Sequence, residues 1–364
     1  MKILLVNKYL YRKGGAETYF IKLGEYLKSL GNEVEYFGMA DERNCVENRV
    51  EAYTENIDFH KKSLKHITYP FKIIYSVNAR KQIRKVLSDF KPDVVHLNNF
   101  NYQLTPSIIY EIKKHNIPIV YTAHDVQLVC PNHKLKNDYT YGLCRKCDGG
   151  KYFECVKNNC VHSSKIRSIL GAVEAWYYKL RHTYKMIDLT VCPSEFMEKE
   201  ISRNDDINGR TVTMYNFIDE IKPLGAECEN YVLYFGRYSE EKGILNLVKA
   251  AKKLSHIPFV FAGKGELENE VNSADNIKNV GFKTGDELRN IIEKALFTVL
   301  PAEWSENCPF SVMESQSLMT PVLGAKIGGI PELINDGKTG ILFESGNLKE
   351  LTEKIEYLYN NKEL

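Results

Sequence analysis

The sequence has no long apolar run. No stretch approaches the roughly 20 apolar residues that cross a membrane, and the opening Met-Lys-Ile-Leu-Leu-Val-Asn-Lys turns polar too soon for a signal peptide. Short-period repeats and low-complexity tracts are also missing. These absences favour a globular protein of the cytoplasm, and a chain of 364 residues is expected to form two domains.

Net charge is small, at +2, but it is unevenly distributed. Residues 1–218 carry 33 lysines and arginines against 24 acidic residues, whereas residues 219–364 carry 16 against 23. Between Phe59 and Ser88 acidic residues are absent, and eight basic ones occur: Lys61, Lys62, Lys65, Lys72, Arg80, Lys81, Arg84 and Lys85. Such a run suits an anionic substrate, nucleic acid or a membrane face, and a solvated helix face explains it equally well.

Short apolar runs alternate with helical patterns in both halves of the chain. Strands are expected at residues 3–6, 34–37, 93–97, 117–122 and, last in the first half, 189–192. The pattern restarts with strands at 231–237, 258–262, 280–282, 297–300 and 321–324. Strands that alternate with helices imply parallel sheets covered on both faces, with ligands at the carboxyl ends of the strands. We predict an α/β fold of two Rossmann-like parallel-sheet domains, 1–218 and 219–364, facing each other across a cleft.

One segment interrupts this alternation. Five of the nine cysteines fall within residues 130–160, which we interpret as an insertion in the first domain. Cys144 and Cys147 form a C-x2-C pair, followed by Cys155 and Cys160. This spacing leaves two interpretations open, a structural zinc bound by these four cysteines or plain reduced thiols. The aromatic and basic residues 161–188 that follow are expected to pack as a helix, with contact to a lipid head group as the alternative.

Two glycine-containing turns suit phosphate. Gly14 and Gly15 stand between the first strand and the first helix, where backbone N–H groups and the helix dipole favour an anion. A third glycine at dinucleotide spacing is missing, which excludes an NAD fingerprint. In the second half, Gly236 precedes Arg237 and Lys242, two cations that can hold a diphosphate in place of a metal ion. No Asp-x-Asp element stands at a strand end to hold Mg²⁺; ion pairing of these cations with Glu240 and Glu241 is the structural alternative.

Three more side chains are candidates for chemistry. Glu306 lies in a polar loop after a buried strand, where a carboxylate can bind sugar hydroxyls and the backbone of the next residues offers N–H groups, except at Pro309. Glu314 suits a ribose diol, but the sequence from Ser311 to Glu314 also fits a capping box at a helix start. His124 follows a strand at its carboxyl end, where we expect it to point into the cleft.

Taken in order, these motifs resemble the retaining, GT-B-fold glycosyltransferases of family four, also called glycosyl transferases group 1. The resemblance rests on Gly-Gly-Ala-Glu after the first strand, His124-Asp125, Cys130-Pro131, Gly-Arg-x-Ser-x-x-Lys-Gly, the E-x7-E pair and Gly-Gly-Ile-Pro-Glu. It covers nearly the whole chain. One departure is Asn-Cys-Pro-Phe-Ser after Glu306, where many members have Gly-Phe-Gly.

The resemblance implies a role for each candidate. Arg237 and Lys242 neutralise the leaving diphosphate, Glu306 holds the transferred sugar, and His124 stands beside the reacting centre as the fourth catalytic residue. The implied donor-binding residues approach the phosphates, the ribose and the base, or contribute backbone beside the sugar: Gly14, Gly15, Gly236, Phe282, Lys283, Asn307, Cys308, Pro309, Phe310 and Glu314.

The expected activity is metal-independent transfer of a hexose or N-acetylhexosamine, with retention, from a nucleotide-diphosphate sugar. The expected nucleotide is UDP, and no cofactor is required. The acceptor is a glycan or a lipid-linked glycan held by the basic first domain, in surface polysaccharide or glycoconjugate synthesis at the inner membrane face; a nucleic acid partner is not expected. Two alternatives remain open, a sugar-nucleotide epimerase on the same fold and a zinc-bearing interaction protein with an inactive nucleotide site.

Overall fold

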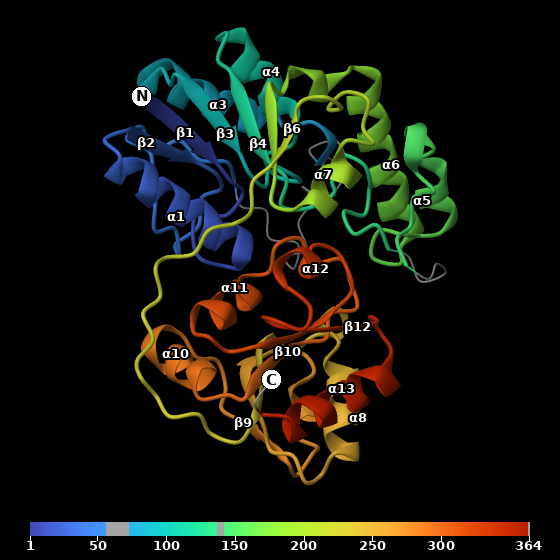
Figure 1. The fold of residues 1–364 in the computed structure, drawn as a ribbon. Helices are drawn as coiled ribbons and strands as arrows, with labels where there is room; N and C mark the ends of the chain where they lie inside the picture. The colour runs from blue at the N-terminus through green and yellow to red at the C-terminus, as the bar shows by residue number, and fades with distance from the viewer. Residues whose placement is uncertain (56–72, 137–141, 363–364) are drawn as a thin grey trace. The chain divides into compact units, whose positions relative to one another are not determined.

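The computed structural model describes residues 1–55, 73–136 and 142–362. The chain divides into two compact units, Met1–Tyr215 and Asn216–Leu364 (Figure 1). Each unit is built on one six-stranded sheet in which every paired strand is parallel. The predicted α/β class with two parallel-sheet domains is therefore confirmed. Lys61, Lys62, Lys65 and Lys72 of the acid-free run lie outside the described residues.

The sheet of the first unit has the order β2-β1-β3-β4-β5-β6. Its strands are β1 (Lys2–Val6), β2 (Glu33–Phe37), β3 (Val94–Leu97), β4 (Ile119–Thr122), β5 (Leu189–Cys192) and β6 (Thr211–Thr213). The prediction that β5 is the last strand of this half was wrong. β6 has only three residues with a single central valine, a pattern too short to signal a strand, and it exists because it pairs with β5 at the sheet edge.

Helices cover this sheet between its strands. They are α1 (Gly15–Ser29), α3 (Val77–Phe90), α4 (Ser107–Lys114), α5 (Phe153–Lys157), α6 (Lys165–Leu180) and α7 (Glu195–Ile201), with short 3-10 turns η2 (Asp148–Gly150) and η3 (Thr183–Met186). Serine side chains cap three of these helices. The Oγ atoms of Ser76, Ser164 and Ser194 each accept a hydrogen bond from the backbone N–H of the residue three positions later in the chain. α1 ends before Gly31, whose φ of 82° allows the turn into β2.

The sheet of the second unit has the order β12-β11-β10-β7-β8-β9. Its strands are β7 (Val232–Arg237), β8 (Phe259–Lys264), β9 (Ile277–Asn279), β10 (Phe297–Leu300), β11 (Val322–Ala325) and β12 (Gly340–Phe343). The strand predicted at residues 280–282 was wrong, because β9 lies three residues earlier. Ile277 is the buried residue of that edge strand, whereas Phe282 is exposed beyond its end.

The helices of the second unit are η4 (Glu240–Lys242), α8 (Ile244–Lys253), α9 (Glu268–Val271), α10 (Gly285–Glu293), α11 (Phe310–Ser317), α12 (Ile330–Leu333) and α13 (Leu348–Asn360). The capping box predicted from Ser311 to Glu314 was wrong. α11 begins one residue earlier, after Pro309, and no side chain caps it. Ser311 lies inside the helix, where its carbonyl accepts a hydrogen bond from Ser315 Oγ at 2.7 Å.

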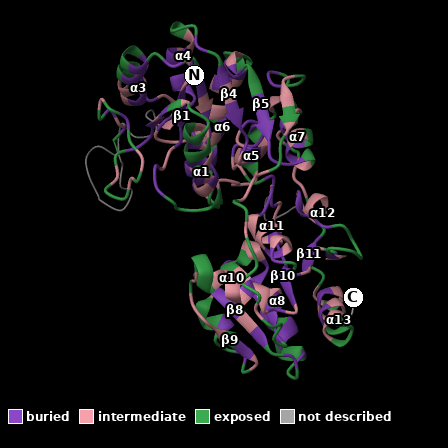
Figure 2. Cartoon of the chain, turned by 60° about the vertical axis from the view of Figure 1, so that its left-hand side comes forward, coloured by how far each residue is buried: buried purple, intermediate pink, exposed green. Residues whose placement is uncertain are grey.

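Each unit has its own hydrophobic core. Central strands such as β1, β10 and β11 are buried on both faces, as expected of parallel strands between two helical layers, and Figure 2 shows these strands in the colour of buried residues. Leu4 and Val6 of β1 pack with α3 and α4, and Tyr234 and Phe261 of the second sheet pack with α8 and α13. The loops that follow the carboxyl ends of the strands are thereby attached to two well-packed sheets.

Candidate active site

The carboxyl edge of the second sheet gathers most of the predicted residues. Gly236 and Arg237 end β7, Lys242 ends the 3-10 turn η4 that follows, and Glu306 lies in the loop after β10. Since β7 and β10 are neighbours in the sheet, these loops leave it side by side. The structure thus brings Lys242 and Glu306 together, although 64 residues separate them in sequence.

Lys242 and Glu306 form a partly buried ion pair. The Lys242 ammonium donates to Oε1 of Glu306, and Trp304 Nε1 donates to the same oxygen at 2.7 Å. The ammonium also lies 5.9 Å from the centre of the Trp304 ring. Glu306 is only 8% exposed, so its carboxylate is held by one cation and one indole N–H at a fixed position on the sheet edge.

The loop that carries Glu306 is fixed from several sides. Glu303 N donates to the carbonyl of Glu241 at 3.0 Å, and Asn246 Nδ2 donates to the Glu303 carboxylate at 2.7 Å. At the other end of the loop, Asn216 Nδ2 donates to the carbonyl of Cys308 at 2.9 Å. These bonds tie the loop to η4, α8 and the first residue of the second unit, and they make it a rigid support.

A glycine turn completes the support. Gly328, which follows β11, has a φ of 61°, and a Cβ added to it would lie 2.0 Å from the carbonyl oxygen of Glu306. Gly329 N donates to that same carbonyl at 2.8 Å. Only glycine permits this approach, so the Gly-Gly of the Gly-Gly-Ile-Pro-Glu motif positions the backbone of Glu306.

Other predicted residues of the second unit are near the edge but differently engaged. Arg237 is exposed, and its guanidinium lies 3.4 Å from the Glu241 carboxylate. Phe282 is also exposed and lies under the ammonium of Lys264, 5.0 Å from the ring centre, while Lys283 pairs with Glu287 at 3.4 Å. The structure therefore joins Phe282 to the end of β8, and it places Glu314 in the second turn of α11.

The residues between Glu306 and α11 are mostly enclosed. Cys308 and Pro309 are buried, Asn307 and Phe310 are partly buried, and burial raises the pKa of the Cys308 thiol to about 11. A buried neutral thiol is a packing group here. The segment leads directly into α11, which begins at Phe310.

In the first unit, His124 follows β4 and forms a defined hydrogen bond. Its Nε2 lies 2.8 Å from Oδ1 of Asn98, and its ring meets Tyr19 edge-on at 5.1 Å between centres. Burial lowers the pKa of His124 to about 4, so the imidazole is neutral near pH 7. Because the amide oxygen only accepts, Nε2 donates and Nδ1 remains an acceptor. Asn98 Nδ2 is buried and has no acceptor within the described ranges.

Gly14 and Gly15 are exposed at the start of α1, with Gly14 in an extended conformation. The first turn of the helix carries Glu17, which is buried, and burial raises the pKa of its carboxyl. The role predicted for this glycine pair, a close approach to a phosphate, stays a prediction.

A group of charged residues at the same edge was not predicted from the sequence. Asp125 Oδ2 lies 3.6 Å from Nδ1 of His133, and the His133 ring stacks on Tyr102 at 5.7 Å. Burial lowers the pKa of His133, but the charges of Asp125 and Glu174 outweigh it and raise the pKa. Of these residues, only Asp125 could be noticed in the sequence, because it follows His124. His133 comes from the cysteine-rich insertion and Glu174 from α6, and only the fold places them near Asp125.

The four cysteines predicted as zinc ligands line one small cavity, together with Cys130. Across the described ranges, no group of three or more histidine, cysteine or acidic residues is arranged to hold a metal ion, and all nine cysteines are free thiols. Burial, followed by the charge of Cys130, raises the pKa of Cys147 to about 12. The structure does not support the zinc prediction for Cys144, Cys147, Cys155 and Cys160.

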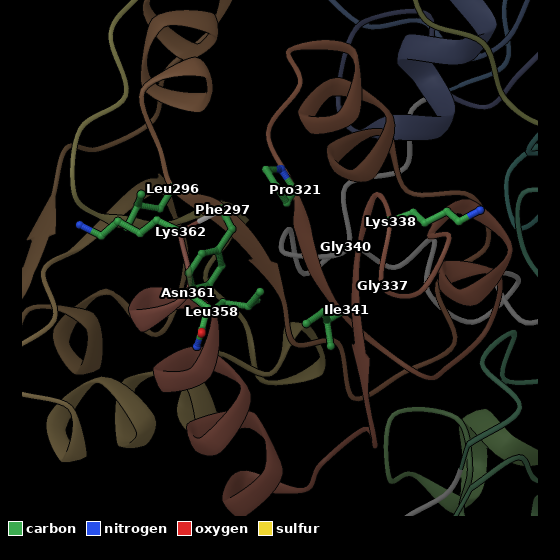
Figure 3. A pocket seen from close by; sticks show the side chains of 10 residues that line it. All are labelled: Leu296, Phe297, Pro321, Gly337, Lys338, Gly340, Ile341, Leu358, Asn361 and Lys362. Atoms are coloured by element: carbon green, nitrogen blue, oxygen red, sulfur yellow. The ribbon is translucent and has the colours of Figure 1, made fainter. Parts of the chain in front are cut away.

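A separate pocket lies at the opposite edge of the second sheet. Figure 3 shows that its lining comes from the starts of β10 and β12 and from the end of α13, with Phe297, Gly340 and Leu358 among its residues. Ligands of parallel sheets bind at the carboxyl ends, and this pocket is at the amino ends. We assign no role to it. None of the described helices is long and apolar enough to span a bilayer.

Trp304, Lys264 and Gly328 join the site without having been singled out beforehand. Trp304 stands two residues before Glu306 and carried a signal as one of only two tryptophans. Lys264 ends β8 opposite Arg237, a position visible only from the register of the two strands. Gly328 belongs to the Gly-Gly-Ile-Pro-Glu motif, but its close approach to Glu306 depends on the neighbouring positions of β10 and β11.

Two parallel-sheet units, with polar and charged groups at the carboxyl ends of their strands, are the architecture of the GT-B class of glycosyltransferase folds. The chain belongs to glycosyltransferase family 4: the model of "Glycosyltransferase Family 4" matches residues 13–221. The model "Glycosyl transferases group 1" matches residues 217–364. The predicted family is confirmed.

Individual proteins agree with this assignment. A Methanocaldococcus jannaschii protein described as a glycosyltransferase is 26% identical over 210 residues, which are 56% of this chain and 58% of that protein. A Klebsiella pneumoniae protein described as lying in the cps region is 26% identical over 357 residues, 92% of this chain and 87% of its own. HepE from Anabaena, solved in complex with UDP, has a TM-score of 0.68 at 17% identity, covering 99% of this chain and 90% of its own. The chain thus spans little more than half the length of the archaeal relative.

Proposed function

We propose that the protein transfers a hexose or N-acetylhexosamine from a nucleotide-diphosphate sugar to a glycan acceptor, with UDP as the nucleotide. The observation that carries this proposal is the Lys242–Glu306 pair, held by Trp304 at the carboxyl edge of the second sheet. The pair places a cation that can bind a diphosphate next to a carboxylate that can accept hydrogen bonds from a sugar. The family membership and the UDP complex of the Anabaena neighbour support the donor class.

The electrostatics of the pair suit the reaction. Breaking the anomeric bond builds negative charge on the diphosphate, and fixed cations stabilise that charge. In the unliganded protein, Lys242 is balanced by Glu306 and Arg237 by Glu241. A bound diphosphate would compete for both cations and leave the Glu306 carboxylate to accept hydrogen bonds from sugar hydroxyls. The two cations supply positive charge at the place where a metal-dependent enzyme holds its metal ion.

We further propose that the anomeric configuration is retained. The acceptor hydroxyl attacks from the face of the leaving diphosphate, which takes up its proton, so that paired hydrolase carboxylates are not needed. His124, neutral and donating from Nε2 to Asn98, orients the donor or acceptor at the reacting centre. Gly14 and Gly15 approach the phosphates, Gly236 and residues 307–310 contribute backbone, Phe282 and Lys283 meet the base, and Glu314 binds the ribose.

The proposed acceptor is a glycan or lipid-linked glycan of surface polysaccharide synthesis, worked on at the inner face of a membrane. The description of the Klebsiella relative as a cps-region protein favours a polysaccharide. The excess of basic residues in 1–218 favours an anionic or membrane-bound acceptor over a neutral soluble one.

A thermal-shift panel of nucleotide diphosphates and nucleotide sugars tests the donor. A ligand that binds only the folded state raises its melting temperature, so UDP and one UDP-sugar should do so and adenosine diphosphate should not. Loss of the UDP-sugar thermal shift in Glu306→Ala would argue against the alternative of an interaction protein with an inactive nucleotide site. Incubation with donor alone tests the epimerase alternative, because an epimerase would form a new sugar nucleotide without acceptor. The anomeric proton coupling of the product decides between retention and inversion.

A further inference from the structure

The solvent-exposed face of α6 is apolar, whereas the exposed face of an ordinary surface helix is polar. Five of its side chains are exposed although they are large and apolar: Ile166, Ile169, Val173, Trp176 and Leu180. Their spacing is three and four residues in alternation. At 3.6 residues per turn these positions fall within an arc of about 80°, and they form one stripe about 21 Å long.

The opposite face of α6 is already packed. Ser168, Ala172 and Tyr178 are buried, and a Cβ added to Gly171 would lie 3.3 Å from the Val161 side chain and 3.4 Å from the Pro131 carbonyl oxygen. The exposed stripe is therefore not the face by which α6 packs on the core of the first unit. Two of its members are among the most exposed apolar side chains of the chain, with Ile166 at 73% and Leu180 at 79%.

Cations border the stripe on both sides. Lys165 and Lys179 follow one flank of the helix, and Arg167 and Arg181 follow the other. The single acidic residue of α6, Glu174, lies near the buried tyrosines 178 and 184 and near His133. Residues 142–185 as a whole contain nine lysines and arginines against three acidic residues.

The neighbouring elements extend and fix this surface. α5 packs beside α6 (Figure 1) and adds Phe153, which is 61% exposed, with Lys151 and Lys157 exposed on either side. Trp176 Nε1 donates to the carbonyl of Gly150 at 3.0 Å, so the indole N–H is satisfied while the ring is partly exposed. An anchored, amphipathic ring is typical of the water–lipid boundary.

α3 provides an internal comparison. It is also basic, with Arg80, Lys81, Arg84 and Lys85, but its apolar residues are buried except for Val77 at its first position. Glu111 pairs with Arg80 at 2.8 Å and with Arg84 at 2.6 Å. The cations of α3 are thus used in part within the fold, and this helix lacks the exposed apolar stripe that α6 has.

We propose that the α6 stripe, defined as Ile166, Ile169, Val173, Trp176 and Leu180 with Phe153 of α5, is a docking surface for anionic membranes. The apolar side chains enter the boundary between head groups and acyl chains, and the flanking cations meet lipid phosphates. The inference deepens the proposed function, since it rests on a lipid-linked acceptor for its purpose, but it is tested without donor or acceptor.

The test is sedimentation with sucrose-loaded vesicles of phosphatidylcholine containing about 30% phosphatidylglycerol, compared with phosphatidylcholine alone. Wild-type protein should bind the anionic vesicles more tightly. The triple variant Ile166→Ser, Val173→Ser, Leu180→Ser should lose at least about 50-fold in partition coefficient. Lys165→Gln with Arg167→Gln should lose about 20-fold, on anionic vesicles only.

A matched control removes three exposed apolar side chains from other surfaces of the first unit: Tyr26→Ser, Leu30→Ser and Val77→Ser. This control should bind vesicles as the wild type does. All variants should keep the wild-type circular dichroism and the UDP thermal shift, which shows that the fold and the donor site are intact. A stripe variant that keeps the UDP shift but loses vesicle binding supports the inference independently of the catalytic proposal.

A second readout uses Trp176 itself. In a Trp304→Phe background it is the sole tryptophan, so vesicles should shift its emission to the blue and doxyl-labelled lipids should quench it. Equal vesicle binding by the stripe variant and the wild type, or an unquenched Trp176, would overturn the inference. The inference would also be overturned if light scattering showed that the wild type is a dimer and the stripe variant a monomer. The stripe would then be covered by a second copy of the chain.

Discussion

At the scale of single residues, the site depends on charges that are balanced inside the protein. Lys242 and Glu306 are the central pair, with 20% and 10% of their side chains exposed. Removing one partner from a pair of this kind leaves the other charge desolvated and without compensation, which costs more than the loss of an exposed pair. A surface pair in the same unit, Lys294 and Glu229 at 2.8 Å, offers the comparison.

Lys242→Met is therefore expected to lower the free energy of unfolding by about 3 kcal/mol. Lys294→Met, which makes the same chemical change at an exposed pair, should lower it by less than about 1 kcal/mol. Urea denaturation followed by tyrosine and tryptophan fluorescence measures both. Equal losses in the two variants would show that the Lys242 pair is no more than a surface contact. Lys242→Met should also abolish the UDP thermal shift, and Lys294→Met should not.

His124 gives a pH prediction. Its folded pKa of about 4 lies below the ordinary value of 6.5, so as the pH falls the unfolded chain takes up the proton first. The wild type should lose stability relative to His124→Gln as the pH falls from about 7 to 4, by about 1.4 kcal/mol per pH unit below 6.5. Unfolding free energies of both proteins at pH 7.5 and 5 measure this difference. A difference independent of pH would mean that His124 titrates normally.

At the scale of elements, turns at strand ends hold the site more than the strands themselves do. The Gly328 turn after β11 is the clearest case, because it presses on the backbone of Glu306. Gly337 has a similar φ, 79° against 61°, but a Cβ there would meet nothing within 4 Å. The two glycines share the conformational requirement and differ only in the contact.

Gly337→Ala is expected to cost about 1 kcal/mol, the strain of a left-handed alanine. Gly328→Ala should cost roughly 3 kcal/mol, because the added methyl also displaces the Glu306 carbonyl. Only the second substitution should weaken the UDP thermal shift. Similar melting temperatures and similar UDP shifts for the two variants would show that the close approach to Glu306 has no consequence.

The cysteine-rich segment gives a second prediction at this scale. Cys45 and Cys228 are exposed, whereas burial keeps thiols such as Cys147 and Cys308 protonated, with pKa values of about 12 and 11. Ellman's reagent at pH 8 should therefore modify these two thiols quickly and the remaining seven more slowly. All nine should react in urea. A count that reaches nine only after a chelator is added would reveal bound metal and restore the zinc interpretation.

At the scale of the whole molecule, each unit has a complete sheet and its own core, the usual requirement for independent folding. Residues 216–364 carry Arg237, Lys242, Glu306 and the Gly328 turn together. Expressed alone, this fragment should unfold cooperatively and should be stabilised by UDP. The same fragment with Lys242→Met is the control. If the fragment folds but its melting temperature does not rise with UDP, donor binding requires groups from residues 1–215.

The sequence was sufficient for most of the architecture. Alternating apolar runs and helical periodicity located β1, β2, β5 and β10 correctly, since buried parallel strands are continuous apolar runs bounded by polar turns. It failed at the edges: β6 and β9 are three-residue strands whose existence depends on pairing with a neighbour. It also failed at α11, where Pro309 rather than Ser311 precedes the first helical residue.

For this protein, the sequence by itself determined the class, the family and the residue types of the site, because strand periodicity and ordered motifs are local properties of the chain. Only the tertiary structure decided which of those residues meet. Lys242, Trp304, Glu306 and Gly328 come together because β7, β10 and β11 are neighbours in one sheet. The apolar stripe of α6 likewise has a pattern that the sequence shows, but the packing of Ser168, Ala172 and Tyr178 decides that it faces outward. Periodicity fixes which residues share a face, and packing against the rest of the chain fixes which face is buried.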